Sequence, residues 1–201
     1  MKQSPDNSFP RKVLHVGCGT PDPKNLHSMF QNPAWEEVRL DIDQSVRPDI
    51  VASLIDMHMV ASQSMDAIYS SHNLEHLYPH EVPSGLSEFY RVLKPSGFAL
   101  ITLPDLQAVA KLIAADKLDE PAYQSPAGPI TPLDILYGHR ASMAGGNLFM
   151  AHKTGFTATT LSAAIFKAGF TWIKIAKNNS FSLWAKAYKT KPEKAEADKP
   201  L

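Results

Sequence analysis

The sequence predicts an α/β fold, namely a doubly wound, mostly parallel sheet of seven strands that ends in a C-terminal antiparallel hairpin. Three observations lead to this class. Short apolar runs of strand length alternate with segments of helical periodicity. A glycine-rich turn directly follows the first apolar run, and an Asn-Asn-Ser turn separates the last two β-rich segments.

Five apolar runs are expected to form the parallel part of the sheet, and two β-rich segments near the C-terminus are expected to form the hairpin. The fifth run is almost continuously apolar, as a central strand buried on both faces should be. The expected strands span residues 13–16, 38–40, 50–52, 66–70, 98–103, 170–176 and 181–188.

Two helices are indicated both by their periodicity and by their ends. Behind Pro83, apolar residues recur at helical spacing over residues 86–93, and Lys-Pro-Ser-Gly at 94–97 predicts the end of that helix. Thr157 has the features of an N-cap for a second helix, which Gly169 closes. We therefore expect helix, turn and strand in succession around residue 95, and a helix before the terminal hairpin.

The length of 201 residues and the hydrophobic content of 44% fit one domain with one sizeable core. We expect this domain to span residues 11–188, between a flexible tail at 1–10 and a disordered charged tail at 189–201. Within it, residues 116–151 contain four prolines and little periodicity. Because this segment is too long for an ordinary connector, we expect it to be an insert that covers the substrate.

The glycine turn is the first sign of a ligand site. Gly17 and Gly19 directly follow the first strand, where glycine allows positive φ and a close approach of the backbone to a ligand. Asp41 ends the second strand about 20 residues later, where a carboxylate can accept hydrogen bonds from both hydroxyls of a ribose. A glycine turn alone also occurs for packing, so Asp41 at this spacing is what favours a nucleoside site.

Four ordered motifs resemble those of class I S-adenosylmethionine-dependent methyltransferases of the type 11 group. They are VLHVGCGT at 13–20, LDID at 40–43, DAIYSSHNLEH at 66–76 and RVLKPSG at 91–97. The resemblance extends over residues 12–104 and implies a Rossmann-like fold. It also implies S-adenosylmethionine as cofactor and methyl transfer by in-line displacement to a small-molecule acceptor that the sequence does not identify.

The resemblance also implies roles for individual positions. The glycine turn holds the methionine part, Asp41 holds the ribose, Ile42 stacks near the adenine, residues 53–56 border the adenine, and residues 71–76 line the methyl-transfer pocket. The expected cofactor-binding residues are Gly17, Cys18, Gly19, Asp41, Ile42, Leu54 and Ser71.

The chain departs from the family pattern at two positions. His15 stands where the family has an acid that anchors the amino end of the cofactor, and Pro21 stands where it often has a third glycine. Asp22 could replace the lost charge. These departures leave open a noncatalytic relative that binds the cofactor without turnover, while a nicotinamide enzyme is disfavoured because the third glycine of its fingerprint is absent.

Histidines supply the candidate bases, because neutral imidazole accepts a proton near pH 7. A base is needed only if the acceptor is a hydroxyl or a protonated amine. The expected catalytic residues are His76, His139 and His152, the expected substrate contacts are His72, Tyr137 and Arg140, and no metal ligand is expected.

One rival interpretation concerns the segment after the fourth strand. His72, Glu75 and His76 fit the H-x-x-E-H pattern of inverted zinc peptidases, which requires an α-helix and a third ligand. Pro79 limits such a helix, and a peptidase leaves the strand and glycine turn unexplained. The methyltransferase is therefore favoured, although His76 could instead pack at the sheet edge and bond a backbone group.

Charge and cysteine content narrow the partners. Lys and Arg number 20, as do Asp and Glu, so the formal net charge of zero gives no field for binding nucleic acid. The single cysteine, Cys18, excludes an intrachain disulfide, and the N-terminus lacks the apolar region of a signal peptide. No apolar run approaches the about 18 residues of a membrane helix. We expect a cytoplasmic protein without a nucleic-acid or membrane partner, of undetermined oligomeric state.

Overall fold

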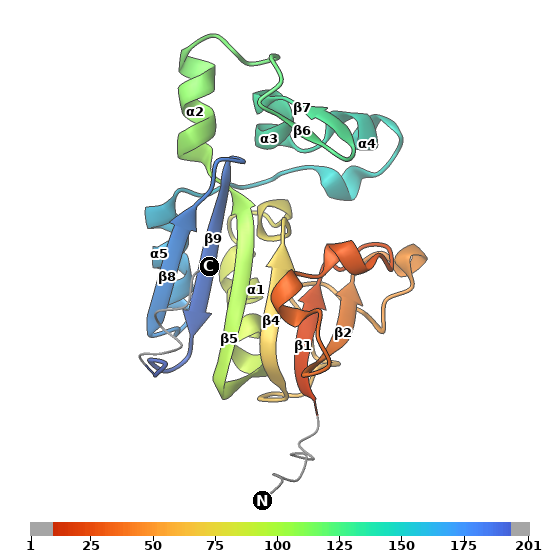
Figure 1. Cartoon of the computed structure of the whole chain (residues 1–201), viewed down its shortest axis with the longest axis vertical. Coiled ribbons are helices and arrows are strands. Elements are labelled where there is room, and N and C mark those ends of the chain that lie inside the picture. Colours follow the sequence, from red (N-terminus) through yellow and green to blue (C-terminus); the bar gives the residue numbers. More distant parts are fainter. Residues whose placement is uncertain (1–9, 194–201) are drawn as a thin grey trace, which may run out of the picture.

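The computed structural model describes residues 10–193 and arranges seven strands in one sheet, in the order β3-β2-β1-β4-β5-β9-β8 (Figure 1). Strands β1 to β5 pair in parallel, and β9 runs antiparallel to both β5 and β8. The predicted fold class, including the terminal hairpin, is confirmed. The strands are β1 Arg11–Val16, β2 Trp35–Asp41, β3 Ile50–Val51, β4 Met65–Ser71, β5 Leu93–Pro104, β8 Trp172–Lys177 and β9 Ser182–Tyr188.

The strand order reverses between β1 and β4, and this reversal positions the ligand site. In open α/β sheets, ligands bind beyond the carboxyl ends of the strands at such a switch point. Gly17 and Gly19 follow β1 at this place, and both have a φ of 60°, which glycine adopts without strain.

One face of the sheet is covered by helices α1 (Val82–Val92) and α5 (Ala158–Lys167), which share an apolar core with the strands. Thr157 forms a capping box with Thr160 at the start of α5, as the sequence predicts. Helix α1 ends one residue earlier than expected. Leu93 already pairs with β4, and residues 94–97 form an irregularity within β5 before the register resumes at Phe98.

The opposite face is covered differently. Its core contains Phe98 from β5 together with Leu26 and Phe30. These last two residues lie in the connection between β1 and β2. Within the described residues 17–34 this connection forms two 3₁₀ helices, η1 (Pro23–Asn25) and η2 (Ser28–Phe30), and no α-helix. The glycine turn is therefore not followed by an α-helical N-terminus.

A small layer of helices and a hairpin lies beyond the carboxyl ends of the parallel strands (Figure 1). Residues 116–151, in which the sequence shows little periodicity, form short elements around a core of Val109, Ile130 and Ile135. Helix α2, which supplies Val109, was not predicted. The elements are α2 Leu106–Ala114, β6 Tyr123–Ser125, β7 Gly128–Ile130, α3 Pro132–Tyr137, α4 Arg140–Ala144 and the 3₁₀ helix η5 Leu148–Met150.

The two predicted tails fall largely outside the described residues, which exclude 1–9 and 194–201. The start of the C-terminal tail needs correction. Lys189 is buried, its ammonium donates a hydrogen bond to the carbonyl oxygen of Leu93, and Thr190 donates to the carbonyl of Pro95. Among the described helices, none is long and apolar enough to cross a membrane.

Candidate functional site

Two cavities adjoin each other between the sheet and the layer above it. The first, of about 480 Å³, surrounds the turn after β1 and the ends of β2 and β4, and is called the glycine-turn cavity. The second, of about 300 Å³, lies between the end of β5 and the insert, and is called the insert cavity. His72, His76 and Met150 line both, so the two cavities share a wall.

The glycine turn is held open by Asn73, which the sequence analysis did not single out. The Asn73 amide donates hydrogen bonds of 2.9 Å to the carbonyl of Val16 and 3.0 Å to that of Ser71. A side chain at Gly17 would collide with this amide, and the φ of 60° adds backbone strain for any other residue. Gly17 is thus required both by its conformation and by its neighbour.

Asp41 is fixed in the same cavity at the end of β2. Its Oδ2 accepts a 2.9 Å hydrogen bond from the Gly19 amide, and its Oδ1 accepts one of 2.9 Å from the Asp43 amide. Each carboxylate oxygen has two lone pairs. Asp41 therefore locks the glycine turn onto β2 and keeps acceptor capacity for two hydroxyl donors.

Apolar side chains form another part of the glycine-turn cavity. Ile42 follows Asp41 and is 51% exposed, which is unusual for a large aliphatic residue within a folded site. It faces the cavity together with Leu54 and Leu77. Six of the seven expected cofactor-binding residues line this cavity, namely Gly17, Gly19, Asp41, Ile42, Leu54 and Ser71.

Cys18 is the seventh, and its side chain lies elsewhere. Its side chain is 2% exposed and lines a separate groove with Asp22 and Glu37, outside the glycine-turn cavity. Burial raises the pKa of its thiol to about 11. His15 is also buried and places Nδ1 2.6 Å from Glu37 Oε1. Asp22, which could replace the charge that His15 lacks, lines the same groove as Cys18 and is not among the residues that line the glycine-turn cavity.

The insert cavity combines aromatic and aliphatic walls with several imidazoles. Tyr123 stacks on Phe181 with ring centroids 6.3 Å apart, and Ile130 contributes an aliphatic wall. His139 lines this cavity with its Nδ1 2.7 Å from the Ser142 hydroxyl. The three histidines expected to be catalytic, His76, His139 and His152, all line the insert cavity, as does the expected substrate contact His72.

The two other expected substrate contacts are not among the residues that line the two cavities. Tyr137 is 61% exposed on α3. Arg140 binds Asp134 with Nε 2.8 Å from Oδ1, and also approaches Asp119 at 3.3 Å. Although burial opposes ionisation of Asp134, Arg140 and Thr131 hold the pKa of its carboxyl well below the usual value. Arg140 therefore fastens α4 to the start of α3.

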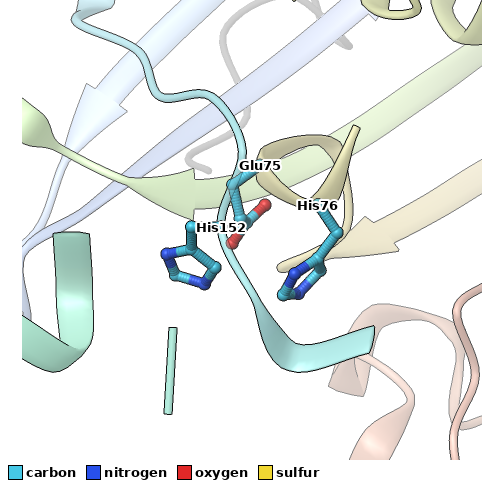
Figure 2. A group of neighbouring side chains, drawn as sticks. All are labelled: Glu75, His76 and His152. Carbon is cyan, nitrogen blue, oxygen red and sulfur yellow. The ribbon is translucent and has the colours of Figure 1, made fainter. Parts of the chain in front are cut away.

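A cluster of Glu75, His76 and His152 lies in the wall between the cavities, and Figure 2 shows the three side chains turned toward a common space. His76 Nδ1 is 3.0 Å from the carbonyl of Ala151, and His152 Nδ1 is 2.9 Å from that of Ile135. Since a carbonyl only accepts, each Nδ1 carries the hydrogen, and in the neutral ring each Nε2 keeps its lone pair.

Glu75 is 1% exposed, and its Oε1 lies 3.1 Å from Nδ1 of His72. Burial alone would raise the pKa of Glu75, but the hydrogen bond from His72 and the charges that the nearby histidines carry when protonated bring it below the usual value. Burial lowers the pKa of His152. The cluster thus favours a carboxylate beside a neutral imidazole near pH 7.

The α-helix required by the zinc-peptidase interpretation is not formed by residues 72–76. Leu74–His76 form a 3₁₀ helix, and His72 precedes it with a φ of 54°. His72 bonds Glu75 instead of sharing a helical face with His76. The peptidase arrangement therefore has no support.

Comparisons with known proteins agree with this geometry. Residues 14–101 match the family model described as "Methyltransferase domain". A SAM-dependent methyltransferase from Archaeoglobus fulgidus aligns with a TM-score of 0.59 at 17% identity, over 89% of this chain and 86% of that one. No match was found among curated protein sequences.

Two further solved structures are similar. The 1,6-didemethyltoxoflavin-N1-methyltransferase of Burkholderia thailandensis, solved with 1,6-didemethyltoxoflavin and S-adenosylhomocysteine, has a TM-score of 0.55 at 16% identity, over 90% of this chain and 72% of that one. A SAM-dependent methyltransferase from Thermotoga maritima has a TM-score of 0.57 at 13% identity, over 90% and 82%. At these identities the structures establish the fold, while the family model identifies the segment that carries the glycine turn.

Proposed function

Since the resemblance to class I S-adenosylmethionine-dependent methyltransferases is confirmed by the family model and the fold, we propose that this chain methylates a small-molecule acceptor. The cofactor occupies the glycine-turn cavity and the acceptor occupies the insert cavity. The observation that carries this proposal is the shared wall of His72, His76 and Met150. In-line transfer requires the reacting atoms to approach to about 3–3.5 Å, and adjoining cavities allow that approach.

The residues of the glycine-turn cavity fit this cofactor. Asp41 has acceptor capacity for two ribose hydroxyls, and its orientation is fixed by the Gly19 and Asp43 amides. Ile42 offers an exposed aliphatic surface to the flat face of an adenine. Gly17 and Gly19 line the cavity with backbone atoms, which the methionine part can approach closely.

In methyl transfer, the protein itself has to bind and orient the acceptor, exclude water and, for some acceptors, remove a proton. When bound, S-adenosylmethionine supplies a methyl group on a sulfonium, which is already an activated leaving group. The insert covers the acceptor and excludes water, while the aromatic and aliphatic walls orient it. An acceptor hydroxyl or ammonium must also lose a proton, which an imidazole of His76, His139 or His152 can take.

Binding of S-adenosylhomocysteine, measured by titration calorimetry, tests the cofactor half of this proposal. Asp41→Asn removes the charged acceptor, so we expect affinity to fall by about 2 kcal/mol, roughly 30-fold. Asp22→Asn is the matched control, because it makes the same substitution at a residue that lines the separate groove. Equal affinities for the wild type and Asp41→Asn would refute the assignment, and so would the absence of binding at millimolar ligand.

Turnover is tested separately, by mass-spectrometric detection of S-adenosylhomocysteine released from S-adenosylmethionine in the presence of an acceptor panel of amines, phenols and carboxylates. We expect release that depends on one acceptor class. Tight cofactor binding without release on any acceptor would instead identify a noncatalytic relative.

A further inference from the structure

We propose that Glu75, His76 and His152 form a binding site for a divalent transition-metal ion, for which zinc is the best match. No metal ligand is expected from the sequence, in which His152 is distant from the other two residues. The fold brings all three side chains together (Figure 2), and His76, one of them, lines both cavities.

The first argument is the spacing of the donor atoms. One potential ligand atom from each residue lies within 4.8 Å of the other two. Zinc binds imidazole nitrogen and carboxylate oxygen at about 2.0–2.2 Å, so donors around one ion are separated by roughly twice that distance or less. The donor atoms would therefore have to move slightly closer together to hold one ion.

The second argument is the orientation of the imidazoles. Metal-bound histidines commonly donate the hydrogen of their other ring nitrogen to a carbonyl or a carboxylate, which fixes the tautomer and the ring. His76 and His152 both donate from Nδ1 to backbone carbonyls, at 3.0 and 2.9 Å. Their Nε2 atoms are thereby prepared as ligands without any metal present.

The third argument is the glutamate. Among the described residues, Glu75 Oε2 is buried and has no hydrogen-bond partner. A buried polar atom without a partner is costly, and a cation would satisfy it. His72 holds the other oxygen at 3.1 Å and so orients the carboxylate from outside the cluster.

The chemical types of the three ligands indicate which ion would bind. Two imidazoles and one carboxylate suit zinc with a further coordination position open, whereas calcium and magnesium favour oxygen ligands alone. His76 and His152 line the insert cavity, so the open position would face it. Water or an oxygen or nitrogen donor of a ligand would complete the coordination. If the proposed function holds, that donor belongs to the acceptor, and His139 remains the imidazole available for proton transfer.

Metal retention tests this site directly. The full chain is stripped with a chelator, given one equivalent of zinc, dialysed against metal-free buffer and analysed by plasma mass spectrometry. We expect about one zinc per chain for the wild type, as for a site with three protein ligands and one open position. In His152→Gln and Glu75→Gln, the affinity for zinc should fall strongly. Loss of an outer-sphere partner already lowers metal affinity by roughly 10- to 100-fold, and these variants lose a direct ligand.

His80→Gln is the matched control, because His80 is exposed, stacks on Tyr78 and is not part of the cluster. It should retain zinc like the wild type. Cobalt added to the stripped wild type should give visible absorption bands that His152→Gln lacks. Glu75→Gln is nearly isosteric, and circular dichroism of each variant shows whether it is folded.

The site is refuted if the wild type retains no more zinc than the folded His152→Gln and Glu75→Gln variants. Zinc is measured without any cofactor, so the two proposals fail separately. Zinc retention without S-adenosylhomocysteine binding would refute the proposed function alone, and the reverse result would refute the metal site alone.

Discussion

The two cavities differ in how the chain builds them. The glycine-turn cavity is formed mainly at the carboxyl ends of β1, β2 and β4, within the segment 14–101 that matches the methyltransferase family model. The insert cavity is formed mainly by residues beyond that segment, from Pro104 to Ser182. The sheet thus determines the cofactor side, while the acceptor side depends on contacts within the insert and between the insert and the sheet.

If this comparison is correct, replacing a glycine of positive φ by alanine should destabilise the protein much more at the glycine turn than in the insert. Gly17→Ala forces both a strained backbone and displacement of Asn73, with an expected loss of about 3 kcal/mol in the free energy of unfolding. Gly146→Ala, in the insert, meets no atom within 4 Å, and strain alone should cost about 1 kcal/mol. Urea denaturation measures both. Equal losses would show that Asn73 does not enforce the turn.

A smaller difference is expected for cofactor affinity. Ile42→Ala removes an aliphatic contact in the glycine-turn cavity and should weaken S-adenosylhomocysteine binding by about 1 kcal/mol, roughly 5-fold. Tyr123→Ala alters only the insert cavity, so its affinity should stay within about 2-fold of the wild type. Calorimetry of both variants decides the question. Equal weakening would mean that the cofactor extends into the insert cavity.

The smallest expected effect is a change in how stability depends on pH, caused by His27 in the connection between β1 and β2. Burial lowers the pKa of His27, whose Nδ1 accepts a hydrogen bond from the Met29 amide. The folded state therefore favours the neutral ring, and this stability is present above the unfolded pKa of about 6.5 and lost as the pH falls below it. His27→Gln should flatten the dependence of unfolding free energy on pH between 5.5 and 7.5. An unchanged slope would exclude His27 as its source.

Much of the cofactor side was predictable because its residues occupy fixed positions after strands. Gly17, Gly19 and Asp41 each follow a strand at the switch point, so strand assignment alone places them together. The side chain of Cys18 lies outside the glycine-turn cavity for a local reason. Gly17 and Gly19, both at positive φ, reverse the chain so that the side chain between them turns away from the cavity.

The acceptor side was less predictable because its contacts are distant in sequence. Tyr137 and Arg140 have the right chemistry for substrate contacts, but Asp134 and Asp119 hold Arg140 in a structural role. No local pattern indicates that His152 meets His76, because the contact depends on how the insert returns to the sheet.

The central claim is that cofactor and acceptor meet at the wall shared by the two cavities. A crystal structure with S-adenosylhomocysteine tests it most directly. We predict ribose hydroxyls within hydrogen-bond distance of Asp41 and a sulfur that faces His72, His76 and Met150. A nucleoside bound in the groove beside Cys18, or a sulfur turned away from the insert cavity, would contradict it.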